Sequence, residues 1–147
     1  MSTQLSTVLD DKGHQVLSIA PEENVLEAIR RMNEKRVGAL LVVADGAPVG
    51  IFTERDVMAR VLACECNPAD TTVAEVMTNK LVVVRASTTV DEAMAICTEK
   101  RCRHLPVMEG DKVLGVVSIG DLTRWATKSQ HHEIQNLVRY ISGQYPA

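Results

Sequence analysis

Two short stretches of the sequence place a hydroxyl side chain and a carboxylate at the same spacing. Residues 50–57 read Gly-Ile-Phe-Thr-Glu-Arg-Asp-Val and residues 115–122 read Gly-Val-Val-Ser-Ile-Gly-Asp-Leu. In each, an apolar run ends in Ser or Thr, which predicts a strand followed by the start of a helix. Free backbone N–H groups at a helix start attract phosphate, and a carboxylate there accepts hydrogen bonds from both hydroxyls of a ribose. The pattern therefore indicates a ribonucleotide site, with the glycines leaving room for a ligand to approach the backbone.

The same residues also have a purely structural interpretation. Thr53 with Asp56, and Ser118 with Asp121, have the spacing of a capping box, which stabilises a helix start by about 1 kcal/mol. Asp is shorter than the Glu or Gln that usually completes this box, so capping alone accounts for the pattern less well. From the motif alone both interpretations remain open.

The motif occurs twice because the chain contains a repeat. A shift of 65 residues aligns residues 6–57 with residues 71–122 without a gap, and repeats of this length indicate copies of one structural unit. We predict one repeat over residues 6–64, a second over residues 71–128, and an extension over residues 129–147. Identical pairs include Thr7/Thr72, Val8/Val73, Glu27/Glu92, Leu40/Leu105 and Asp56/Asp121.

Each copy contains the same predicted order of elements, β-α-β-β-α. Asn24 and Thr89, each followed by Glu three residues later, predict helix starts. Short apolar runs predict buried strands, over residues 16–19, 39–43 and 49–52 in the first copy and 81–84, 105–108 and 113–117 in the second. A second helix is expected to begin at Thr53 or Ser118. Two such units leave sheet surface to cover, so we expect an α+β (α/β-like) fold in which the copies pack with pseudo-two-fold symmetry.

The doubled motif resembles the signature of CBS domains, the regulatory repeats of cystathionine β-synthase, which occur in pairs called Bateman modules. The run Arg-His-Leu-Pro-Val over residues 103–107 is also similar to that family, and the resemblance covers residues 6 to about 127. It implies ligand sites in the cleft between the copies. One site would use Ile51, Thr53, Arg55 and Asp56 with Val82, Arg103, His104 and Pro106 of the other copy. The second would use Val116, Ser118, Gly120 and Asp121 with Leu17, Gly38, Ala39 and Leu41.

The two implied sites differ in charge. Arg103 and His104 in the second copy correspond to Gly38 and Ala39 in the first. Arg103 offers a fork of donors to phosphate, and protonated His104 would add a pH-dependent charge. Gly120 stands where the first copy has Arg55. We therefore expect the Asp56 site to bind a phosphate-bearing ligand more tightly. The structural alternatives are a solvated Arg103 and a strand-edge His104 satisfied by a neighbour.

The resemblance implies an adenine nucleotide as ligand. AMP is expected first, then ADP, ATP, NAD(H) or S-adenosylmethionine, with no catalytic cofactor. The chain would then be a stand-alone regulatory module rather than an enzyme, signalling through a change of module or dimer geometry. Expected partners are a second copy, giving a homodimer, and a regulated protein. The alternative is a structural or adaptor homodimer whose nucleotide sites have decayed.

Composition and the remaining motifs exclude several other classes. A net charge of −3 argues against nucleic-acid binding, and no apolar run is long enough to cross a membrane. The first eleven residues resemble no signal peptide, so the four cysteines are expected to be reduced thiols in the cytoplasm. No phosphate loop or nucleophile elbow occurs, so no catalytic residue is expected. Zinc spacing is incomplete, so no metal site is expected at Cys64/Cys66, Cys102/His104 or His131/His132.

The extension after the second copy predicts one more helix. Ile134, Leu137, Val138 and Ile141 recur at helical spacing, and Gly143 follows them. We expect this amphipathic helix to pack on its own module, or else across a dimer or onto a regulated enzyme.

Overall fold

The computed structural model describes residues 3–127. The predicted C-terminal helix within residues 129–147 therefore lies outside the described residues.

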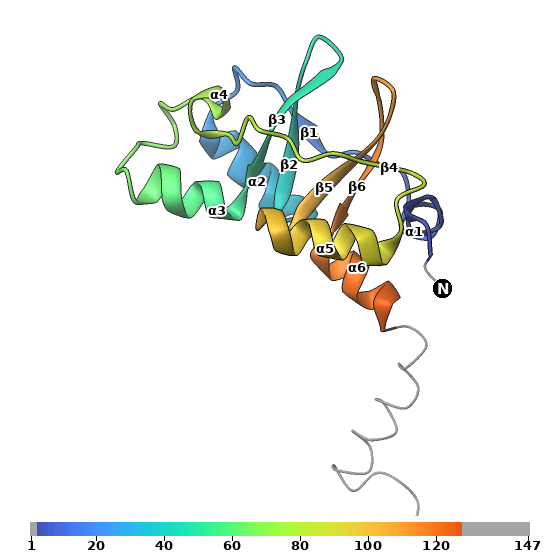
Figure 1. The fold of residues 1–147 in the computed structure, drawn as a ribbon. Helices are drawn as coiled ribbons and strands as arrows, with labels where there is room; N and C mark the ends of the chain where they lie inside the picture. The colour runs from blue at the N-terminus through green and yellow to red at the C-terminus, as the bar shows by residue number, and fades with distance from the viewer. Residues whose placement is uncertain (1–2, 128–147) are drawn as a thin grey trace, which may run out of the picture.

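Each repeat forms a three-stranded sheet with its own helices (Figure 1). In both sheets the first two strands are parallel and the last two antiparallel. The α+β fold of two β-α-β-β-α repeats is confirmed. Repeat 1 contains β1 (Ser18–Ile19), α2 (Val25–Lys35), β2 (Ala39–Ala44), β3 (Ala47–Thr53), α3 (Glu54–Asp56) and the π-helix η1 (Val57–Leu62). Repeat 2 contains β4 (Val84–Arg85), α5 (Val90–Lys100), β5 (His104–Glu109), β6 (Lys112–Ser118) and α6 (Ile119–Ala126).

The two long helices begin and end where local chemistry places their ends. The Asn24 side chain accepts a hydrogen bond from the Glu27 N–H at 2.8 Å, and Thr89 forms a complete capping box with Glu92. Arg36 and Arg101 then end α2 and α5 in the left-handed conformation, with φ of 55° and 54°. The predicted helix starts are confirmed. They could be read from the sequence because a cap involves only residues within one turn of the helix.

Two shorter helices are exchanged between the repeats, so that the helix preceding each repeat packs in the core of the other. α1 (Leu5–Lys12) precedes repeat 1, yet its apolar residues are buried in the core of repeat 2. α4 (Val73–Val76) precedes repeat 2 and is buried in the core of repeat 1. Figure 1 shows α4 beside the first sheet and α1 beside the second. Each core is therefore closed by a helix that the repeat alignment assigns to the other copy.

Backbone hydrogen bonds show that α1 and α4 are aligned differently from the rest of the repeat. The Leu5 N–H donates to the Thr88 carbonyl, and the Val73 N–H donates to the Glu23 carbonyl, both at 2.8 Å. Thr88 and Glu23 are 65 residues apart, but Leu5 and Val73 are 68 apart. The alignment of Thr7 with Thr72 and Val8 with Val73 was therefore wrong. Repeat 1 has three more residues between this helix and its first strand.

The motif glycines make room for these exchanged helices. A Cβ on Gly50 would lie 2.6 Å from Met77 Sδ and 2.8 Å from the Thr78 carbonyl oxygen. On Gly115 it would lie 2.7 Å from Leu9 Cδ2. The expectation that these glycines give a ligand access to the backbone is thus replaced by a packing role, because protein atoms already occupy that space.

We expect Gly50→Ala to lower the free energy of unfolding by about 1–3 kcal/mol, since the added methyl meets backbone that cannot yield cheaply. Gly120→Ala is the matched control. A Cβ there finds its nearest atom, Ser118 Oγ, at 3.6 Å, so this change should stabilise α6 slightly. Urea unfolding measures both, and equal stabilities of the two variants would contradict the packing role.

Candidate functional site

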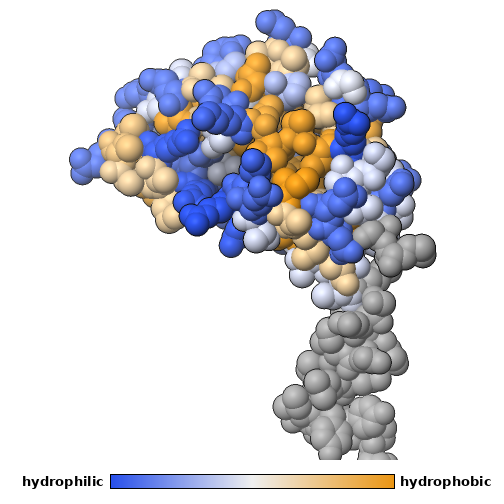
Figure 2. Space-filling model, viewed as in Figure 1, coloured by the Kyte–Doolittle hydropathy of each residue, from blue (hydrophilic) through white to orange (hydrophobic). Residues whose placement is uncertain are grey.

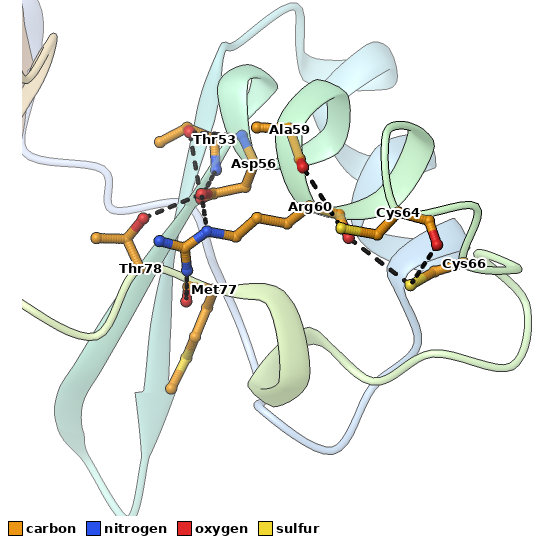
Figure 3. Close-up of polar contacts among 8 residues, drawn as sticks. All are labelled: Thr53, Asp56, Ala59, Arg60, Cys64, Cys66, Met77 and Thr78. Carbon is orange, nitrogen blue, oxygen red and sulfur yellow. Dashed lines mark hydrogen bonds and ion pairs between the residues drawn. The ribbon is translucent and has the colours of Figure 1, made fainter.

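The Asp56 half of the site is a capping box at the end of β3 (Figure 3). The Thr53 N–H and hydroxyl donate to Asp56 Oδ2 at 3.0 and 3.2 Å, and the Asp56 N–H donates back to Thr53 Oγ1 at 3.3 Å. The Thr78 hydroxyl donates to the other carboxylate oxygen, Oδ1, at 3.0 Å. The Asp56 residue is only 4% exposed. Its carboxylate is therefore buried and serves as a helix cap.

Two residues beside Asp56 were missed by the sequence analysis. Arg60 Nε lies 3.7 Å from Asp56 Oδ1, and Arg60 Nη1 donates to the Met77 carbonyl at 2.8 Å (Figure 3). The spacing of four residues from Asp56 was the available signal for Arg60. Thr78 follows α4 and forms two backbone hydrogen bonds with Ile51. No local pattern could place Thr78, because its position depends on the exchange of α4.

The Asp121 half has the same cap but a different neighbour. The Ser118 N–H donates to Asp121 Oδ2 at 2.9 Å, and the Asp121 N–H donates to Ser118 Oγ at 3.1 Å. The Lys12 ammonium, at the end of α1, donates to Asp121 Oδ2 and to the Val116 carbonyl, both at 2.6 Å. Burial opposes ionisation of Asp121, but the hydrogen bonds from Lys12 and Ser118 outweigh it and hold the pKa of Asp121 below its ordinary value. Lys12 was not predicted.

His104 lies where the two repeats meet. It begins β5 opposite Ser118, and its Nε2 would be 3.5 Å from a Cβ built on Gly38 of the other repeat. Glu54 Oε1 would be 2.9 Å from the same point. Burial, followed by the nearby Lys12 charge, lowers the pKa of His104 below 6.5. Burial therefore disfavours the charged imidazolium that was expected to contribute to phosphate binding.

The structure distributes the other predicted site residues between core, junction and surface. Ile51 pairs with Leu41 in the first sheet, and Val116 pairs with Pro106 in the second. The charged side chains expected at the Asp56 site are exposed, namely Arg55 and Arg103, and so is Gly120. The partly buried members are Leu17, Gly38, Ala39, Val82 and Val116.

A pocket of about 490 Å³ lies on repeat 1, at the end of α2 and the start of α3. Its lining includes Met32, Gly38, Glu54 and Val57. Of the site residues predicted from the sequence, Gly38 lines this pocket, and neither Asp56 nor Asp121 does.

The cysteine thiols interact with the protein backbone or are buried, and they show no arrangement for metal binding within residues 3–127. Cys64 and Cys66 donate to the carbonyls of Ala59 and Arg60 at 3.7 Å (Figure 3). Burial raises the pKa of Cys97 to about 11, which makes its thiol a poor nucleophile. Among residues 3–127, no group of three or more metal-ligating side chains is close enough to hold an ion; His131 and His132 lie outside this range. No helix within the same residues has the length and apolar character to cross a membrane.

The lowered pKa of His104 predicts a pH dependence of stability. As the pH falls through and below 6.5, the unfolded chain binds a proton at His104 before the folded chain does, so the free energy of unfolding decreases. His104→Gln should therefore lose less stability than the parent protein between pH 7 and pH 5 in urea unfolding. His14→Gln should lose more, because Asp10 raises the pKa of His14. An NMR titration placing the pKa of His104 above 6.5 would contradict this assignment.

Comparison with protein families identifies both repeats. The family model described as the CBS domain matches residues 8–63 and again residues 73–128. The CBS domain-containing protein CBSX3, mitochondrial, of Arabidopsis thaliana is 37% identical over 98% of this chain and 74% of that protein. The CBS domain-containing protein YhcV of Bacillus subtilis is 31% identical over 80% of this chain and 84% of its own length.

Solved structures show the same architecture. A putative signal-transduction protein with CBS domains from Burkholderia ambifaria is 40% identical, with a TM-score of 0.84 over 87% of this chain and 96% of that one. A hexameric CBS-CP12 protein from bloom-forming cyanobacteria is 29% identical, with a TM-score of 0.75 over 84% of this chain and 71% of that one. The resemblance seen in the sequence is thereby confirmed over the described repeats.

Proposed function

The chain belongs to the CBS domain family, and from that premise we propose that it is a regulatory module that binds an adenine nucleotide between its two repeats. AMP is the first candidate, followed by ADP, ATP and NAD(H). The observation that carries the proposal is the inward-turned Asp56 carboxylate, which sits at a helix start beside the Thr53 and Thr78 hydroxyls. A ribose hydroxyl would take the place of the Thr78 hydroxyl on Oδ1.

The surroundings of Asp56 supply the other requirements of a nucleotide. Arg60 brings a cation to within 3.7 Å of the carboxylate, and its guanidinium suits a phosphate. Because Thr78 belongs to the segment joining the repeats, a ligand held by Asp56 and Thr78 would link that segment to β3. Binding would then favour one arrangement of the repeats, by as much as the ligand's affinity differs between arrangements.

A homodimer and a cytoplasmic location complete the proposal. η1 exposes Met58 and Leu62, each 64% accessible, which gives a second copy or a regulated protein an apolar surface to contact. Figure 2 also shows hydrophobic residues gathered near the middle of the face viewed, with hydrophilic residues on both sides.

The proposed compartment is the cytoplasm, and cell fractionation tests it. One CBS relative, in Arabidopsis, is named as mitochondrial.

One observation favours the second candidate, an adaptor that binds no nucleotide. Asp56 is almost completely buried and already accepts hydrogen bonds from Thr53 and Thr78. In an adaptor these contacts would stabilise only the helix start and the connecting segment. Thermal shifts with AMP, ADP, ATP and NAD separate the two functions, because a nucleotide at a hundred times its Kd should add about 2.7 kcal/mol of stability. No shift with any of the four would favour the adaptor.

We expect Asp56→Asn to weaken AMP binding by about 10- to 100-fold, the usual effect of losing a hydrogen bond to a charged acceptor. Asp121→Asn should weaken it less, because Lys12 already occupies that carboxylate. Asp111→Asn, on the exposed turn between β5 and β6, is the matched loss of charge and should leave the affinity unchanged. Isothermal titration calorimetry measures all three, after melting curves show that each variant folds. Equal losses at Asp56 and Asp121 would contradict the expected asymmetry.

A further inference from the structure

The two halves of the site differ in what fills the space beside the motif aspartate. In repeat 1, Thr78 satisfies the Ile51 carbonyl with its backbone N–H at 2.9 Å and Asp56 with its hydroxyl at 3.0 Å. Val116 is the residue equivalent to Ile51 in repeat 2. There a single ammonium, Lys12 Nζ, satisfies both the Val116 carbonyl and Asp121. One cation thus replaces two neutral donors.

The three extra residues of repeat 1 account for this replacement. Leu9 packs against Gly115 in the same way that Met77 packs against Gly50, so Leu9 and Met77 are equivalent positions in α1 and after α4. Beyond Met77 the chain is extended and Thr78 pairs with Ile51. Beyond Leu9 the helix continues to Lys12 and ends at Gly13, whose N–H donates to the Leu9 carbonyl at 2.7 Å. The backbone of α1 therefore provides no partner like Thr78, and the Lys12 side chain fills that place.

This ammonium opposes the binding of a neutral ribose hydroxyl to Asp121. The Lys12 and Asp121 side chains are 37% and 13% exposed and lie 2.6 Å apart, so the ion pair is partly shielded from water. A ribose hydroxyl arriving at Asp121 Oδ2 would exchange a charge-assisted hydrogen bond for a weaker one. It would also leave the Val116 carbonyl without the donor that Lys12 supplies. At Asp56 the hydroxyl that a ribose replaces is neutral, so the exchange there is nearly even.

We propose that Lys12 is a resident counter-ion that keeps the Asp121 half of the site closed to ribose-bearing ligands, and so determines that the first nucleotide binds at Asp56. This inference rests on the proposed nucleotide function. It assigns Lys12 as a specificity-determining residue, located on α1, which is longer than its counterpart α4.

The test is the stoichiometry and affinity of AMP binding to Lys12→Met, which keeps an unbranched side chain one atom shorter and removes the ammonium. We expect calorimetry to detect one AMP per chain in the parent protein, with any second AMP bound too weakly to measure. Lys12→Met should bind that second AMP about tenfold more tightly, the usual effect of one charge-assisted hydrogen bond. Lys100→Met is the matched control. Lys100 is also the last residue of a helix, α5, and is exposed, so this variant should bind AMP as the parent protein does.

A double variant assigns the new site. Adding Asp121→Asn to Lys12→Met should abolish the second AMP and leave the first. Lys12→Gln serves in place of Lys12→Met if melting curves show that the methionine variant does not fold. Weaker AMP binding by the lysine variant would mean that Lys12 contacts the ligand. Unchanged binding would mean that Lys12 does not block the Asp121 site. Either result overturns this inference and leaves the proposed nucleotide function standing. If neither the parent nor the variant binds AMP, the proposed function fails and the inference fails with it.

Discussion

The burial of each leading helix in the core of the other repeat is the constraint on which the remaining structure depends. Leu5, Val8 and Leu9 are fully inaccessible in the second core, and Val73 and Val76 are buried in the first. Side chains of this size each contribute about 1.5–3 kcal/mol when buried. Removing either helix would therefore expose the opposite core, so neither repeat has a complete core of its own.

This exchange also positions the polar groups of the candidate site. Each motif aspartate is held at its helix start by residues three positions away in sequence, Thr53 or Ser118. The group that approaches its other side comes from the exchanged segment, Thr78 after α4 or Lys12 at the end of α1. The same packing that completes the cores thus determines the charge next to each carboxylate. A ligand that binds there would act directly on the contact between the repeats.

The positive charges nearest the two motif aspartates differ from those expected from the sequence, which were Arg103 and His104. Burial and Lys12 lower the pKa of His104 and disfavour its protonated form, and the Arg103 side chain is exposed. The cations that contact the two carboxylates are Arg60 and Lys12. One belongs to the helix of the motif and the other to the exchanged helix. The proposed preference of a nucleotide for Asp56 therefore rests on the closer pairing of Lys12 with Asp121, at 2.6 Å, and not on Arg103 or His104.

The sequence by itself determined the repeated unit, its strands and the four helix starts, because caps and apolar periodicity depend on residues within a few positions of one another. It also indicated the family, through the motifs at residues 50–57 and 115–122. Only the tertiary structure decided which side chains meet the two aspartates. Thr78 and Lys12 are 22 and 109 residues from their partners, and an alignment without gaps conceals the three extra residues that distinguish α1 from α4. Contacts of that kind follow from how whole helices pack, and no local pattern encodes them.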